Sequence, residues 1–310
     1  MISIALAAYN GAKYISEQLD SILSQNYQDF ELIICDDCST DNTWQIIEEY
    51  ARKDNRIKIY ENNENLGFKK NFEKAISLCN GEYIALSDQD DIWTNNHLDV
   101  LLKNINEKSA STGNALIIDK DGVEQNYTLS EGDCYNIDGN EIDKLYTILC
   151  NRNPFFGAIS IFRKDFFNIA MPIPDSVKYH DAWFAAVACC LNGLNYTFEP
   201  LLKHRVHGMN ETGNHQNNLS NKISNAFKQK ARYAQYNQKK NMCDALITQI
   251  PNMSLEIKGT INLIREYYKN RFRNNRLATI SFIRKHYKQI YSTNSYKNVL
   301  IRCIKIILLG

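Results

Sequence analysis

Short apolar runs alternate with segments of helical periodicity over the first 120 residues. The apolar runs are typical of buried strands, and they cover residues 2–8, 30–35, 57–60 and 83–86. Between them, apolar side chains recur every three or four positions, which predicts helices over residues 12–24, 39–52, 68–79 and 94–105. This alternation favours a mostly parallel sheet covered by helices on both faces.

The regularity weakens after residue 120. The remaining predicted elements are strands over 157–162, 196–198 and 201–206, and an Ala-rich buried helix over 181–191. From about residue 219 the chain is helical, basic and aromatic in pattern. We therefore expect a boundary near residue 215, with an α/β domain over 1–215 and a helical region over 216–310.

Charge is distributed unevenly along the chain. The net charge is only +1, yet residues 221–310 hold 18 Lys and Arg against three acids, a balance of +15. The first 220 residues hold 18 basic and 32 acidic groups, a balance of −14. Such a split predicts that the C-terminal region meets an anionic partner. Membrane headgroups are the expected partner, because the region has no nucleic-acid-binding motif.

Cysteine usage and the N-terminus indicate a reducing compartment. There are nine cysteines, and Met1 leads directly into a strand without the basic and apolar segments of a secretory signal. Cys35 and Cys38 match C-x-x-C, but no second pair stands at zinc-ligand spacing. No apolar run reaches the roughly 18 residues that a membrane span needs. We expect a cytoplasmic protein with reduced thiols.

Carboxylates follow two of the predicted strands. Asp36-Asp37 ends the second, and Ser87-Asp88-Gln89-Asp90-Asp91 follows the fourth, while Tyr9-Asn10-Gly11 follows the first. Parallel strands expose their carboxyl ends on one edge, where ligands bind, so these residues are expected to converge.

The dense group after the fourth strand is a candidate metal site. Neighbouring carboxylates repel one another, and a cation compensates that repulsion. Oxygen ligands suit Mg²⁺ or Mn²⁺, which also bind diphosphate oxygens. The alternative is a solvated helix N-terminus, with Asp91 as a cap. A glycine-rich dinucleotide or P-loop signature is absent, which argues against dinucleotide oxidoreductases and P-loop enzymes.

Taken together, the motifs resemble those of family 2 glycosyltransferases with the A-type (GT-A) fold. The matching segments are Ala7–Gly11, Cys35–Asp41, Asn65–Gly67, Ser87–Trp93, His180–Trp183 and Arg205–Asn210. The run Ser87–Trp93 resembles bacterial rhamnosyltransferases of cell-surface polysaccharide synthesis. Residues 1–120 would then be a donor half and residues 121–215 an acceptor half. Cys38 departs from the family's usual glycine, and His204 from a common aromatic residue.

The resemblance implies a role for each matching residue. Asp181 would be the general base, and Asp88, Asp90 and His207 would hold Mn²⁺ or Mg²⁺. The implied nucleotide-sugar contacts are Ala8, Tyr9, Asn10, Asp37, Asn65, Lys70, Asp88, Gln89, Trp183 and Arg205. A carboxylate base without a nucleophile gives a single displacement with inversion. For Trp183 and for Phe155-Phe156-Gly157, core packing is the alternative.

The basic region complements this interpretation. Arg271, Arg273, Arg284 and Lys285 stand among aromatic residues, and Leu300 and Ile304 belong to an amphipathic segment at the end. Such segments bind membrane surfaces, which predicts a peripheral enzyme on the inner face of a bacterial plasma membrane acting on a lipid-linked glycan. The alternatives are a solvated helical appendage or a homodimer interface. Rival functions are an inactive nucleotide-sugar-binding scaffold and a sugar nucleotidyltransferase.

Overall fold

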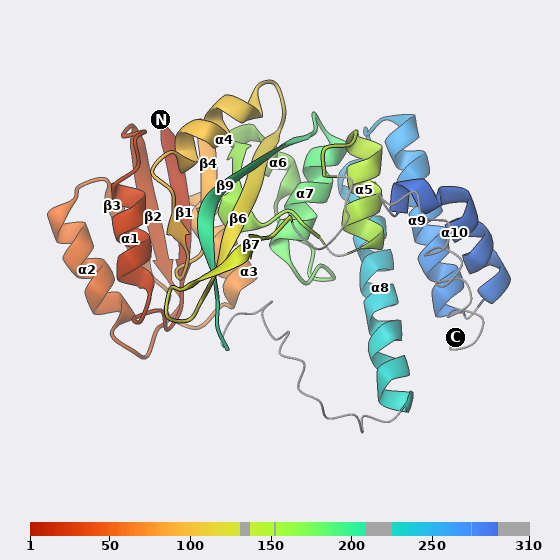
Figure 1. The fold of residues 1–310 in the computed structure, drawn as a ribbon, viewed down its shortest axis with the longest axis horizontal. Coiled ribbons are helices and arrows are strands. Elements are labelled where there is room, and N and C mark those ends of the chain that lie inside the picture. The colour runs from red at the N-terminus through yellow and green to blue at the C-terminus, as the bar shows by residue number, and fades with distance from the viewer. Residues whose placement is uncertain (131–136, 152, 209–224, 274, 291–310) are drawn as a thin grey trace.

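The computed structural model describes residues 1–130, 137–151, 153–208, 225–273 and 275–290. Its centre is one mixed sheet with helices on both faces (Figure 1). Four neighbouring parallel strands form one half in the order β3-β2-β1-β4. They are β1 (Ile2–Ala8), β2 (Phe30–Asp36), β3 (Ile57–Glu61) and β4 (Tyr83–Ser87). The parallel arrangement predicted for the first 120 residues is confirmed for these four strands, which end at Ser87.

The other half of the sheet is mixed. Its strands are β8 (Ser160–Arg163), β6 (Ala110–Asp119), β9 (Leu194–Val206), β5 (Ile92–Trp93) and β7 (Glu124–Thr128). Strand β8 pairs antiparallel with both β4 and β6, whereas β6 and β9 are parallel. Strand β6 was not predicted, because its first five residues, Ala-Ser-Thr-Gly-Asn, are small and polar.

Strand β9 corrects a second expectation. Two short strands were predicted on either side of Pro200, but one strand runs from Leu194 to Val206. Pro200 lies where the register with β6 shifts, between the pairs Asn114↔Pro200 and Ala115↔Leu202. A proline cannot donate to the ladder, and an irregular position of this kind accommodates it.

Alternate strand residues face two apolar layers. Ile4 and Leu6 of β1 pack with α1 (Ile15–Leu23), α2 (Thr43–Lys53) and α4 (His97–Ile105). Ala5 faces the opposite layer, which contains α3 (Phe68–Ser77), α5 (Glu141–Cys150) and α7 (His180–Cys190). The short elements η1 (Gly157–Ile159), η2 (Lys164–Phe166) and α6 (Phe167–Ala170) lie between β8 and α7 along the chain.

The C-terminal helices belong to the second layer. They are α8 (Asn225–Gln249), α9 (Leu255–Phe272) and α10 (Arg276–Ile290). Leu246 of α8 and Ile264 of α9 are fully buried in the same apolar cluster as Trp183 of α7. The predicted boundary at 215 and the amphipathic segment with Leu300 and Ile304 lie outside the described residues. Among the helices described, none has the length and apolar character to cross a bilayer.

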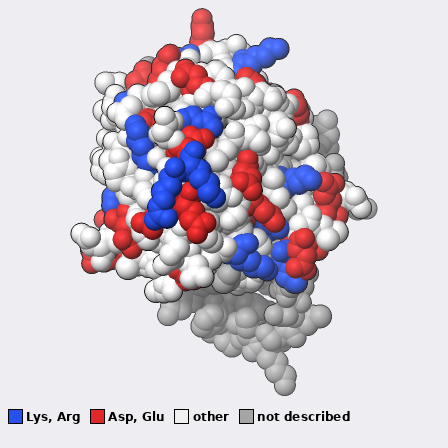
Figure 2. Space-filling view, turned by 90° about the vertical axis from the view of Figure 1, so that its left-hand side faces the viewer, with Lys and Arg blue, Asp and Glu red and all other residues white. Residues whose placement is uncertain are grey.

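The face around α2 carries both signs of charge. Lysine and arginine lie beside aspartate and glutamate over this end of the molecule (Figure 2). Arg52 and Glu48 of α2 form one ion pair, with 3.1 Å between nitrogen and oxygen. This surface therefore lacks the single-signed field that attracts a polyanion.

Glu31 joins three segments at the opposite end of the sheet from the strand carboxyl ends. Its carboxylate accepts hydrogen bonds from Ser3 Oγ, the Asn80 backbone N–H and Lys58 Nζ, each at 2.6 Å. Burial alone would raise the pKa of Glu31, but these donors outweigh burial and lower it to about 2. Since the unfolded value is about 4.5, the ionised carboxylate stabilises the fold at neutral pH.

We therefore expect Glu31→Gln to lower the unfolding free energy by up to about 3 kcal/mol at pH 7. A lowered folded pKa stabilises above the unfolded value, so the difference should shrink as pH falls from about 4.5 towards 2. Urea unfolding at pH 7 and pH 3 measures it. Glu48→Gln, which breaks an exposed pair, is the control, with an effect below about 1 kcal/mol. A deficit of equal size at both pH values would contradict the assignment.

Candidate active site

The carboxyl ends of β1, β2 and β4 meet at one edge of the sheet, as predicted. Asp37 donates its backbone N–H to Ala8 O at 2.8 Å. The side-chain amide of Gln89 pairs with the backbone of Tyr9, with Tyr9 N–Gln89 Oε1 at 2.8 Å and Gln89 Nε2–Tyr9 O at 2.9 Å. A Cβ atom on Gly11 would lie 2.2 Å from Gln89 Oε1, so a larger residue at position 11 would displace the Gln89 amide from this position.

The residues after β1 leave one ring open to a ligand. Tyr9 is 46% exposed, so its aromatic face is accessible beside the strand ends. Asn10 has φ 48° and accepts the Thr40 backbone N–H on Oδ1 at 2.8 Å. Of the predicted nucleotide contacts in this segment, Tyr9 therefore has the exposed side chain, whereas the Asn10 amide stabilises the neighbouring turn.

Asp37 is almost fully buried and organises the segment after β3. Its carboxylate accepts hydrogen bonds from Asn62 Nδ2 at 2.6 Å and from the backbone N–H groups of Leu66 and Gly67 at 2.8 Å. Asn65 Nδ2 donates to Asp37 O at 3.2 Å. Both predicted nucleotide contacts, Asp37 and Asn65, thus shape the loop that leads into α3.

The acidic loop after β4 is held against the end of β9. His207 Nε2 lies 2.8 Å from Asp90 Oδ2. The Asp91 carboxylate lies 2.9 Å from His204 Nδ1 and accepts the Arg205 backbone N–H at 3.1 Å. Asp91 is fully buried and precedes β5, so the alternative interpretation of Asp91 as a helix cap is wrong.

Arg205 anchors this loop to α1. Its guanidinium donates to Asp90 O at 3.0 Å and forms an ion pair with Glu17. The same group stands 4.6 Å from the centre of the Tyr14 ring, and Tyr14 in turn lies 4.9 Å from the His207 ring. Since Arg205 is only 2% exposed, the structure assigns it a supporting position rather than the direct substrate contact expected from the sequence.

Negative charge is concentrated at this loop. Burial, together with the neighbouring charges of Asp91 and Asp90, raises the pKa of Asp88 well above its ordinary value. Burial lowers the pKa of His204, but the Asp91 charge and hydrogen bond outweigh it and raise that pKa to about 9. His204 is therefore a cation at neutral pH and offsets Asp91, which leaves Asp88 and Asp90 to meet a ligand.

The predicted metal ligands are arranged in part. The side chains of Asp90 and His207 are in contact, and the charge of Asp90 raises the pKa of Asp88. Within the described ranges, no group of three or more His, Cys, Asp or Glu side chains is arranged to hold a metal ion. Mg²⁺ and Mn²⁺ sites of nucleotide enzymes use one or two protein carboxylates and complete their shell with phosphate oxygens and water. The pair Asp90–His207 beside Asp88 fits that requirement.

Asp181 stands at the second position of α7. Its carboxylate accepts the Ala182 backbone N–H at 2.7 Å, and burial raises the pKa of Asp181 to about 6. The charge of Asp181 contributes to the raised pKa of Asp88, so the two carboxyl groups lie within electrostatic reach. A carboxylate with a pKa near neutrality, opposite an acidic loop, is suited to take a proton.

The two remaining residues predicted to bind substrate differ in their surroundings. Trp183 is fully buried in the apolar core and donates its indole N–H to Ala170 O at 2.8 Å, so the prediction of a substrate contact is wrong. Lys70 is half exposed in the first turn of α3 and pairs with Glu73 at 2.7 Å, and its substrate contact stays a prediction.

Sequence reasoning missed the contribution of α1. Tyr14, just before α1, and Glu17 and Gln18 of α1 lie on the side that meets the acidic loop. The side-chain amide oxygen of Gln18 accepts a hydrogen bond from Ser87 Oγ at 2.7 Å. The sequence signal for this contribution was a glutamine on the apolar face of the helix, beside Ile15, Leu19 and Ile22. In the structure Gln18 is fully buried there. A polar side chain on an apolar face requires a partner.

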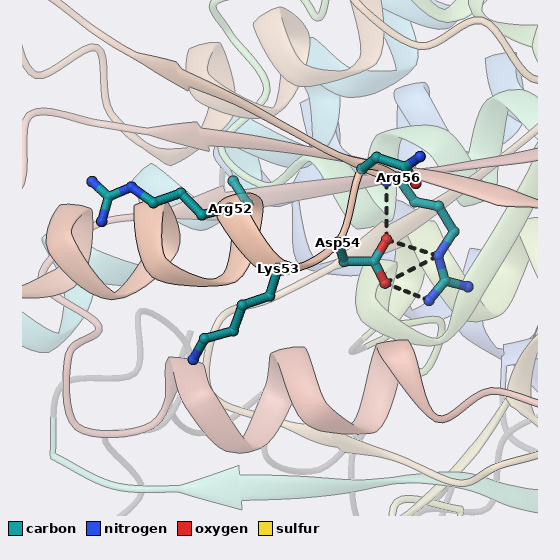
Figure 3. Close-up of a pocket in the computed structure, with 6 residues that line it drawn as sticks. Arg52, Lys53, Asp54 and Arg56 are labelled. Carbon is teal, nitrogen blue, oxygen red and sulfur yellow. Dashed lines mark hydrogen bonds and ion pairs between the residues drawn. The ribbon is translucent and has the colours of Figure 1, made fainter.

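A separate surface hollow lies between α2 and β3 and is lined by residues 51–56 (Figure 3). Asp54 and Arg56 form a two-pronged ion pair there, with Arg56 Nε–Asp54 Oδ1 at 3.0 Å and Nη2–Oδ2 at 2.6 Å. These residues precede β3, so the hollow lies at the amino end of that strand. Ligands of parallel sheets bind at the carboxyl ends, which places the candidate active site elsewhere.

Known sequences share this pattern. The family model described as "Glycosyl transferase family 2" matches residues 3–169, more than half of the chain. GlyG of Streptococcus pneumoniae is 35% identical over 135 residues, which are 44% of this chain and 42% of GlyG. An uncharacterized glycosyltransferase of Haemophilus influenzae is 29% identical over 243 residues, covering 74% and 72% of the two chains. The glucosyltransferase WfaP of Escherichia coli is 44% identical over 93 residues, 30% of this chain and 36% of WfaP. The chain thus spans less than half of GlyG and of WfaP.

Solved structures share the fold. TarS 1–349 of S. aureus with UDP-GlcNAc has a TM-score of 0.60 at 20% identity, covering 99% of this chain and 81% of TarS. The mannosyltransferase PcManGT of Pyrobaculum calidifontis with GDP-Man and Mn²⁺ has a TM-score of 0.52 at 16% identity, covering 99% and 85%. These likenesses confirm the predicted GT-A fold. With the family match over residues 3–169, the chain belongs to glycosyltransferase family 2.

Proposed function

We propose that the chain transfers a sugar from a nucleoside-diphosphate sugar to a hydroxyl of a cell-surface glycan, with inversion. The observation that carries this proposal is the position of Asp181, whose pKa is raised to about 6, within electrostatic reach of the Asp88–Asp90 loop. The loop would receive the diphosphate end of the donor, and Asp181 would accept the proton of the attacking hydroxyl. Tyr9 would contact the base at the edge of β1.

The proposal includes a divalent cation. Asp90 and His207 would hold Mn²⁺ or Mg²⁺, with Asp88 next to them. When bound, such an ion neutralises charge that gathers on the leaving diphosphate. Arg205 and Glu17 would keep Asp90 in place, because the Arg205 side chain donates to the Asp90 carbonyl and also forms an ion pair with Glu17 of α1.

The donor is proposed as a UDP-hexose, with dTDP-L-rhamnose as the alternative from the motif resemblance. WfaP is named as acting with UDP-Glc on a GlcNAc-diphosphoundecaprenol, which supports a UDP-hexose and a lipid-linked acceptor here. The C-terminal helices suit such an acceptor: Phe272 is 53% and Leu277 83% exposed, and Arg273 and Arg284 are exposed nearby in the sequence. Apolar and basic side chains together favour an anionic membrane surface, on the cytoplasmic side, over a homodimer interface.

Transfer should follow the ionisation of Asp181. Since a protonated carboxyl cannot accept a proton, kcat/KM is expected to rise as pH increases through about 6 and to level off above pH 7. A pH–rate profile between pH 4.5 and 8 measures this, with circular dichroism to confirm that the protein stays folded. A flat profile across pH 6 would remove Asp181 from the role of base.

A donor screen tests the proposed function. Purified protein is incubated with UDP-glucose, UDP-galactose, UDP-N-acetylglucosamine or dTDP-L-rhamnose, with Mn²⁺ or Mg²⁺ and with chelator. Release of nucleoside diphosphate from one donor, abolished by chelator, supports the proposal. Activity that persists in chelator overturns the metal, and binding without turnover in the presence of acceptors supports a scaffold instead.

A further inference from the structure

The last turn of α5 is closed by the two C-terminal helices α8 and α9. Carbonyl groups at the end of a helix have no partner within that helix. Lys239 of α8 donates its Nζ to Ile148 O at 2.6 Å and to Asn151 O at 3.2 Å. Tyr268 of α9 donates its hydroxyl to Leu149 O at 2.7 Å. Side chains from beyond residue 225 therefore fix the point at which the chain leaves α5.

The segment that leaves α5 packs against the start of α7. Asn153 stabilises a turn there, with Asn153 Nδ2–Phe155 O at 2.6 Å and Phe155 N–Asn153 Oδ1 at 3.2 Å. A Cβ atom on Gly157 would lie 2.9 Å from His180 Nε2, so the backbone approaches His180 closely. A hydrogen bond from Asn153 also favours the ionised form of Asp181 and lowers its pKa against the effect of burial.

Lys239 adds charge to this contact. Burial lowers the pKa of Lys239, and the charge of Asp181 acts against that effect. In turn, the Lys239 ammonium lowers the pKa of Asp181 and favours the ionised carboxylate. The other titratable groups near Lys239 are the thiols of Cys150 and Cys243. Burial raises the pKa of both thiols far above neutrality, so both are uncharged. Lys239 therefore acts on Asp181 in two ways: it fixes the carbonyl end of α5, and its charge favours the ionised form of Asp181.

We propose that Lys239 is a positioning residue of the active site: by fixing the end of α5 at Asn151, it holds residues 153–157 against Asp181, so that α8 contributes to the geometry of the transfer centre. This inference rests on the proposed function of Asp181 as base. It gives the C-terminal region a second role beside membrane contact: the helices complete the acceptor side of the site.

The test compares variants of the full chain. Lys239→Met should lower kcat by about tenfold or more, because small displacements at a reacting centre are costly, while the donor KM stays within about twofold. Lys239→Arg keeps a cation with several donors and should recover most of the loss. Tyr268→Phe removes one carbonyl contact without changing charge, and should give a smaller loss. Lys240→Met is the matched control. The ammonium of Lys240 pairs with Asp244 of the same helix at 2.6 Å, so this variant should behave as the parent protein.

A second measurement separates this inference from the proposed function. Amide hydrogen exchange over residues 150–157 should be faster in Lys239→Met than in the parent and in Lys240→Met. This measurement does not depend on enzymatic activity. A parent protein that transfers no sugar would overturn the proposed function, and the exchange rates would still show whether Lys239 holds this segment in place. Should Lys239→Met not fold, Tyr268→Phe provides the comparison instead: it should lower kcat and speed exchange over these residues, whereas Lys239→Arg should stay close to the parent protein. Parent-like kcat and exchange in Lys239→Met, or equal losses in Lys240→Met, would overturn the inference.

Discussion

Asp181→Asn is expected to lower kcat for sugar transfer by about 10²–10⁴-fold, with little change in donor Kd. The amide keeps the size of the side chain and its oxygen for the Ala182 N–H, but it cannot take a proton. Single-turnover transfer and equilibrium binding of the nucleotide sugar measure the two quantities separately. The variant should also lose the rise in activity near pH 6.

Asp175→Asn provides the control for this change. Asp175 is exposed in the segment before α7, so its loss should leave kcat and donor binding unchanged. A variant lacking the Asp181 carboxylate that transfers sugar at the parental rate would show that another group accepts the proton. A variant that loses donor binding in parallel would instead place Asp181 in the donor site.

Asp90→Asn is expected to lower kcat/KM by about 10²-fold or more. Asp90 is the carboxylate that contacts His207, and its loss weakens the proposed hold on the cation and the donor diphosphate. The Mn²⁺ concentration that gives half-maximal activity should rise in the same variant. Initial rates over a Mn²⁺ titration at fixed donor concentration measure both effects.

Asp99→Asn is the matched control, because Asp99 lies exposed on α4 and outside the acidic loop. Thermal unfolding of each variant verifies that the Asp90–His207 contact is not required for folding. An unchanged Mn²⁺ requirement in Asp90→Asn would exclude Asp90 as a ligand and leave Asp88 as the carboxylate ligand of the proposed site.

The acidic loop shows what sequence patterns can predict. Asp88 and Asp90 were expected near the ends of β1 and β2 because parallel strands share an edge, and the contact between Gln89 and Tyr9 confirms that convergence. The parallel strands themselves are short, continuous apolar runs, which the pattern predicts well. Strand β6 begins with small and polar residues, so the local pattern did not predict it. The pattern did predict a strand at β8, but not its antiparallel pairing with β4 and β6, which joins residues far apart in the sequence.

Side-chain partners were much harder to predict. Trp183 and Arg205 belong to motifs, yet the first packs in the core and the second bonds Glu17 and the Asp90 carbonyl. Motif membership alone does not distinguish a residue that touches a ligand from one that supports it. Lys239 carries no motif, and its contacts with α5 arise from packing across about 90 residues of sequence.

The most direct test of the central claim is the transfer reaction followed to its product. The purified full chain is incubated with a UDP-hexose, Mn²⁺ and a polyprenyl-diphosphate-linked sugar, and the isolated glycolipid is analysed by mass spectrometry and NMR. We predict one added hexose per released nucleoside diphosphate, with the anomeric configuration opposite to that of the donor. A product that retains the donor's configuration, or no product with any nucleotide sugar and acceptor, would contradict the account.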